Sequence, residues 1–97
     1  MLLENGNEWV MPLIAAFLGI IVRMYWESGG QHKAAHVHAQ YGGSQIVISL
    51  TGRVLDGKFP KRQLRILTEW MDEHKAELRA NWELAKDQRP LFKITEA

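Results

Sequence analysis

The sequence predicts an α+β fold in which an antiparallel β-meander of three to five strands is followed by two C-terminal helices packed on one face. Apolar and polar residues alternate between glycine turns over residues 19–50, as in half-buried strands. Apolar residues recur at steps of three and four over residues 60–87, as in helices. A chain of 97 residues, 46% of them hydrophobic, has room for one core. We therefore divide it into an N-terminal extension, residues 1–10, and a single α+β domain, residues 11–97.

Three segments predict the central strands. The first is the β-branched and aromatic run from Gly19 to Trp26. A loop at Gly29-Gly30 and a turn at Gly42-Gly43 then separate strands over residues 36–41 and 45–50. One-sided burial of an antiparallel sheet produces such alternation. It assigns these residues to the buried face: Ile20, Val22, Met24, Trp26, Val37, Ala39, Tyr41, Ile46, Ile48 and Leu50.

Two shorter segments predict further strands at the ends of the meander. They are residues 13–17 and residues 53–55, the latter before a turn at Asp56-Gly57. The second face of the sheet collects polar and aromatic residues, and we expect it to be open or covered by a partner. These residues are Arg23, Tyr25, His36, His38, Gln40, Gln45 and Ser49.

The second half of the chain predicts two helices. Pro60 suits a first helical turn, where its missing amide hydrogen costs nothing. One straight helix from there to Asp87 would be about 42 Å long, against a radius of gyration of ~13 Å for such a domain. We therefore predict a break at His74, with Glu77 placed as in a capping box. The buried stripe comprises Leu64, Leu67, Met71, His74, Leu78, Trp82 and Ala85.

The end of the chain follows from the same pattern. Trp70 and Trp82 are expected to pack in the core rather than in an interface. Pro90 ends the second helix, and residues 91–94 return as a tail or an edge strand.

Composition excludes several classes of protein. A net charge of +1 gives no global field toward nucleic acid or anionic lipid, so any such binding must be local. Without cysteine there is no disulfide and no thiolate metal site, and we expect a cytoplasmic protein. The uncharged segment of residues 9–22 is shorter than the about 18 residues of a membrane span, and Pro12 and Gly19 interrupt it. We expect neither membrane insertion nor export.

The histidine cluster is the most distinctive local feature. His36 and His38 lie two apart on one strand, so their side chains leave the same face roughly 6–7 Å apart. With His32 from the preceding loop they would supply three ligands, the minimum for a zinc site. The alternative is that these residues are hydrogen-bonded surface histidines and that the protein needs no cofactor.

The same pair also suits acid–base catalysis. His36 and His38 would exchange protons near neutral pH, while Arg23 and Tyr25 on the neighbouring strand would bind a phosphate. This arrangement would serve a small nuclease. Such pairs are also common on inert sheets, so the sequence leaves open whether the chain is an enzyme.

A basic cluster surrounds the start of the first helix. Lys58, Lys61, Arg62 and Arg65 lie where the helix dipole disfavours positive charge. They indicate a site for an anion or an acidic partner, and nucleic acid is the weaker candidate. The alternative is a solvated surface.

In the order and spacing of many short motifs, the sequence resembles a bacterial family of small proteins known only as a domain of unknown function, number forty-one sixty. The resemblance covers almost all of the chain from Met11 to Ile94. Its points are Met11-Pro12, Gly19-Ile20, Met24-Tyr25, the spacing of His32, His36 and His38, Phe59-Pro60, Glu69-Trp70, Glu77-Leu78 and Asn81-Trp82. The chain departs from the family at Ala34 and Ala35, where members typically carry two prolines, so the loop before the histidines should be looser.

The resemblance implies a partner more than an activity. Members of the family look like halves of two-gene units similar to toxin and antitoxin pairs. Our leading hypothesis is an interaction module that docks a cognate small protein, or a second copy of itself, through the open sheet face. The alternative is a metal-assisted or histidine-dependent nuclease that uses His36 and His38.

Overall fold

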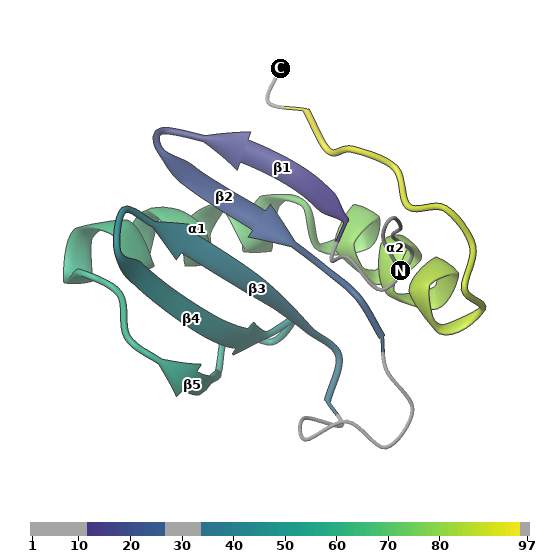
Figure 1. Cartoon of the computed structure of the whole chain (residues 1–97), viewed down its shortest axis with the longest axis horizontal. Helices are drawn as coiled ribbons and strands as arrows, with labels where there is room; N and C mark the ends of the chain where they lie inside the picture. Colours follow the sequence, from purple (N-terminus) through teal and green to yellow (C-terminus); the bar gives the residue numbers. More distant parts are fainter. Residues whose placement is uncertain (1–11, 27–33, 96–97) are drawn as a thin grey trace.

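The computed structural model describes residues 12–26 and 34–95 and confirms the predicted α+β fold. Five strands form one antiparallel sheet with neighbours in chain order, β1-β2-β3-β4-β5, and both helices lie behind this sheet (Figure 1). The predicted extension and the loop at Gly29-Gly30 lie outside the described residues. The elements are β1 Leu13–Phe17, β2 Ile20–Arg23, β3 His36–Tyr41, β4 Ser44–Ser49, β5 Val54–Gly57, α1 Lys61–Glu73 and α2 Lys75–Lys86.

The core lies between the sheet and the helices, on the face that the alternation predicts. Ile20 and Val22 of β2 and Met24 just after it are fully buried. Trp70 and Trp82 cover the core from the side of the helices. Burying an aliphatic side chain of this size contributes about 1.5–3 kcal/mol. Burial of the core between the sheet and the helices is therefore the main source of stability for a chain of this length.

The predicted break between the helices is confirmed at His74. The backbone N–H of His74 donates to the Trp70 carbonyl at 3.0 Å, and its own carbonyl accepts from Leu78 at 2.9 Å. The imidazole Nδ1 lies 2.6 Å from Oε1 of Glu77, and the ring caps no backbone N–H in the first turn of α2. Glu77 therefore pairs with the ring instead of completing a capping box.

The predicted turn at Asp56-Gly57 is wrong, because both residues belong to β5. The N–H of Lys58 still donates to the Gln45 carbonyl at 3.0 Å. Gly57 has φ +79°, and a Cβ at this position would lie 2.3 Å from the Gln45 oxygen. Glycine is thus required by the close approach of two strands and does not mark a turn. The segment from Gly19 to Trp26 also forms a shorter strand than its pattern suggests, since β2 ends at Arg23.

Residues 91–94 form a tail and not a strand, which settles the predicted alternative. The N–H of Ile94 donates to the Ile14 carbonyl at 2.7 Å, so the tail runs beside β1 (Figure 1). Asn81, fully buried on α2, donates from Nδ2 to the Phe92 carbonyl at 2.9 Å. Its Oδ1 accepts from the Phe92 N–H at 3.0 Å. One helical side chain thus holds the tail against the edge of the sheet.

Candidate functional site

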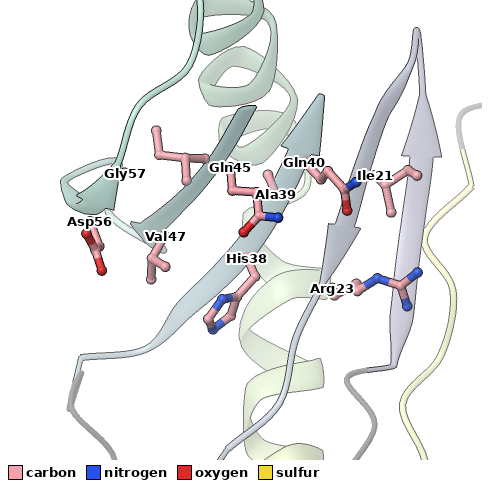
Figure 2. A pocket seen from close by; sticks show the side chains of 10 residues that line it. Ile21, Arg23, His38, Ala39, Gln40, Gln45, Val47, Asp56 and Gly57 are labelled. Carbon is pink, nitrogen blue, oxygen red and sulfur yellow. The ribbon is translucent and has the colours of Figure 1, made fainter. Parts of the chain in front are cut away.

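A row of side chains crosses four strands on the face of the sheet opposite the helices. Arg23 of β2 is the partner of His38 of β3, and His38 is the partner of Val47 of β4. Val47 is in turn opposite Asp56 of β5. Directly opposed residues project to the same face, and Figure 2 shows these side chains in front of the sheet with a helix behind. The row places a cation at one end and a carboxylate at the other.

A shallow groove of about 300 Å³ follows this row and the next one, which contains Ile21, Gln40 and Gln45. Gln40 and Gln45 are exposed, whereas Ile21 and Val47 are half-buried. The groove therefore offers apolar contact together with amide donors and acceptors. Sequence reasoning missed Ile21, Val47 and Asp56, although Ile21 and Val47 alternate with core residues of their strands.

The second face of the sheet was predicted to be open or covered by a partner, but at His36 the chain itself covers it. This residue is 7% exposed, and its cross-strand partner Ser49 is 4% exposed. The His36 ring centroid lies 5.2 Å from that of Trp82 on α2. Figure 1 shows α2 at the end of the sheet where β2 ends and β3 begins. The helix covers the start of β3, which buries His36 although strand alternation would expose it.

The predicted catalytic residues gather in one place but present few reactive atoms. His38 lies between Tyr25 and His36, with ring centroids 5.1 Å and 5.2 Å away. The Nδ1–H of His36 donates to the Ala34 carbonyl at 2.6 Å, which makes Nε2 the acceptor in the neutral ring. Nε2 of His38 is shielded from solvent. Tyr25, His38 and His36 thus form a chain of ring contacts with Arg23 opposite His38 in the register, and the His36 ring is buried.

The predicted metal ligands are only partly described. His32 lies outside the described residues. Among the residues that the structure does describe, no group of three or more histidine, aspartate or glutamate side chains could hold a metal ion. His36 and His38 provide two imidazoles, and zinc sites use at least three protein ligands. The zinc site therefore stays a prediction.

The predicted basic cluster lies on the surface at the corner where β5 leads into α1 (Figure 1). Lys58, Lys61, Arg62 and Arg65 are all exposed, and the first turn of α1 contains no acidic residue. Arg53, which the sequence analysis did not include, is an exposed residue just before β5. The feature of the sequence that could have added Arg53 to the basic cluster is its position next to the edge strand.

The comparisons with known proteins give a family and no activity. Residues 19–83 match the family described as Domain of unknown function (DUF4160). The chain belongs to this family. The match covers about two thirds of the DUF4160 chain, and it includes the cross-strand row and the basic cluster. No curated protein and no solved structure matches the chain.

A separate finding concerns membranes. Over residues 12–26 and 34–95, the DUF4160 chain has no helix that combines the length and the apolar character needed to cross a bilayer.

Proposed function

We propose that this DUF4160 chain is a protein-interaction module that docks a small cognate protein through the outer face of its sheet. It would be one half of a two-gene, toxin–antitoxin-like unit. The observation that supports this most is the groove across β2 to β5, on the face that the helices leave uncovered. An antiparallel sheet with one solvated face needs no groove to fold. A hollow with mixed chemistry on that face is what a partner can use.

The chemistry of the groove suits a protein better than an enclosed small molecule. Its volume of about 300 Å³ is at the lower limit for small-molecule sites. Ile21 and Val47 provide apolar contact, while Arg23 and Asp56 provide opposite charges at its two ends. Protein interfaces typically combine an apolar centre with a polar rim. One or two protruding side chains of a partner would fill this space.

The test is co-purification with the product of the neighbouring gene. We expect the tagged wild-type chain to retain that product and the Val47→Glu variant to lose it, because a carboxylate would enter the apolar centre of the groove. Leu18→Glu is the matched control, since Leu18 is 75% exposed in the β1–β2 turn and far from the row in register. Absence of the neighbour from the wild-type sample, or equal retention by Val47→Glu, would contradict the proposal.

A histidine-dependent nuclease is the second candidate. Its support is the convergence of the two imidazoles with Arg23 and Tyr25, and the hydrogen bond that leaves Nε2 of His36 as an acceptor. The burial of His36 weighs against it, because a general base must reach its substrate. RNA turnover that is lost in both His36→Ala and His38→Ala would favour this candidate. Stoichiometric zinc in purified protein without a partner would favour its metal-assisted form.

A further inference from the structure

The two edges of the sheet differ in what covers them. The tail runs along β1, where the N–H of Ile94 donates to the Ile14 carbonyl. In the part of the chain that the structure describes, no strand pairs with the outer side of β5. On its inner side, the N–H of Lys58 donates to Gln45. Successive strand residues direct their amides to opposite sides. Gly57 precedes Lys58, and Val54 follows Arg53, whose carbonyl accepts from the Ser49 N–H on the inner side. The N–H groups of Gly57 and Val54 are therefore directed outward, on either side of the register shift that leaves Leu55 unpaired. The edge therefore offers backbone donors and acceptors to an added strand.

The surroundings of this edge are strongly basic. Residues 53–65 carry five basic side chains and one acidic side chain, a net charge of +4, whereas the rest of the chain carries −3. The basic side chains are Arg53, Lys58, Lys61, Arg62 and Arg65. All five are exposed. The surface ion pairs of lysine in the described ranges lie elsewhere, at Lys75 with Asp72 and at Lys86 with Glu83.

This charge decides between the occupants of the edge. A second copy of the chain paired along β5 would bring a second +4 segment against the first, and opposed like charges destabilise strand pairs. An acidic polypeptide would instead neutralise the cluster. Val54, which is 42% exposed on β5, adds an apolar surface for a neighbouring strand. A nucleic acid could use the basic side chains and the backbone N–H groups, but its phosphates would leave the backbone carbonyls of the edge without a donor.

We propose that the partner adds an extended, acidic segment to the outer edge of β5 as a sixth strand. Its carboxylates would lie against Arg53, Lys58 and the basic first turns of α1. Backbone pairing supplies affinity in this mode of recognition, and alternate side chains supply specificity. The inference rests on the proposed function and specifies the chemistry of the partner segment. The groove and the edge form one continuous surface, because the groove reaches Asp56 and Gly57 of β5.

The experiment is selection from a random dodecapeptide display library against the full-length chain, followed by affinity measurements on synthetic copies of the enriched peptides. We expect the enriched peptides to be acidic and rich in β-branched residues. Their affinity should fall at least about tenfold in Lys58→Glu/Arg62→Glu, because two attractive charges become repulsive. It should stay within about twofold in the matched control Arg79→Glu/Lys93→Glu, which makes the same charge change on another exposed surface.

Two readouts test the edge itself. Val54→Pro removes an outward N–H at the first residue of the strand, a change that edge strands tolerate, and it should also lower affinity at least about tenfold. Should this variant fail to fold, amide exchange in the wild-type complex replaces it. The Val54 and Gly57 amides should then exchange more slowly with peptide bound.

Other outcomes would overturn the inference. These are enriched peptides without acidic excess, unchanged affinity in Val54→Pro, tighter binding of a single-stranded RNA dodecamer than of any peptide, and dimerisation through β5. The two proposals fail separately. Loss of the neighbouring gene product in Val47→Glu but not in Val54→Pro would support the groove and contradict the edge. Binding of acidic peptides that depends on β5, without retention of that product, would support the edge and contradict the groove.

Discussion

The β1 and β5 edges of one sheet meet solvent in opposite ways. At β1 the chain returns and covers its own edge, with Ile94 bonded to Ile14 and Asn81 holding Phe92. At β5 the described chain adds no strand, and the edge is short and surrounded by positive charge. Exposed edges invite unwanted pairing, and natural proteins block them with cover or with charge. This chain uses both devices, and the charged edge still admits a partner of opposite sign.

Release of the tail from the β1 edge should have the largest effect on stability. We expect Asn81→Ala to lower the free energy of unfolding by about 3 kcal/mol, because two hydrogen bonds to a part-buried stretch of the tail are lost and the backbone groups of Phe92 lose their partners. Urea denaturation measures this change. The variant should also self-associate at high concentration, since β1 becomes a second open edge. Glu83→Ala, an exposed neighbour on α2, should change stability by less than about 0.5 kcal/mol. Equal stability of the two variants would show that the tail is not held by Asn81.

A second substitution tests the apolar part of the same cover. Ile94 is 3% exposed and Phe92 is 39% exposed. Ile94→Ala should cost about 2 kcal/mol, at the lower end for a buried aliphatic truncation because a tail can relax around the gap. Phe92→Ala should cost less than half of that. Thermal unfolding followed by circular dichroism compares them, and a larger loss in Phe92→Ala would mean that the tail packs differently.

Much of this architecture was readable from the sequence. Alternation over β2 to β4 and the three-and-four spacing from Leu64 to Ala85 reflect burial on one side of each element, so they predicted the sheet and the helices. The break at His74 followed from the length that one unbroken helix would have. The tail contact was not predicted. Asn81 shows only as a polar residue beside the buried stripe, and the group that it binds lies eleven positions away.

The site was predicted in part. Arg23, Tyr25, His36 and His38 do gather, because a period of two places them on one face. The burial of His36 by Trp82 was beyond a periodicity argument, since it depends on where α2 crosses the end of the sheet. Asp56 was missed because Asp-Gly is typical of turns, and here it ends an edge strand.

A third substitution tests the close approach of β5 to β4. Gly57→Ala should cost about 1–2 kcal/mol, because φ is +79° and the new Cβ would meet the Gln45 oxygen. The matched control is Gly43→Ala, where nothing lies within 4 Å. That control should be neutral or slightly stabilising. Equal midpoints in urea would contradict the close approach of β5 to β4.

The smallest expected effect has the opposite sign. Lys61 is the first residue of α1, so Lys61→Glu should raise the free energy of unfolding by about 0.3–1 kcal/mol through the helix dipole. The same change should weaken binding of an acidic peptide. Denaturation and peptide titration of one sample test both halves. A variant that gained stability without losing affinity would mean that Lys61 takes no part in binding.

Amide hydrogen exchange of the complex is the most direct test of strand addition to the β5 edge. The full-length chain would be compared with and without an enriched acidic peptide, residue by residue, along β1 and β5. We expect slower exchange at Val54 and Gly57 and no change in β1, because only the β5 edge gains a strand. Slower exchange confined to β1 or to the helices, with β5 unchanged, would contradict the account.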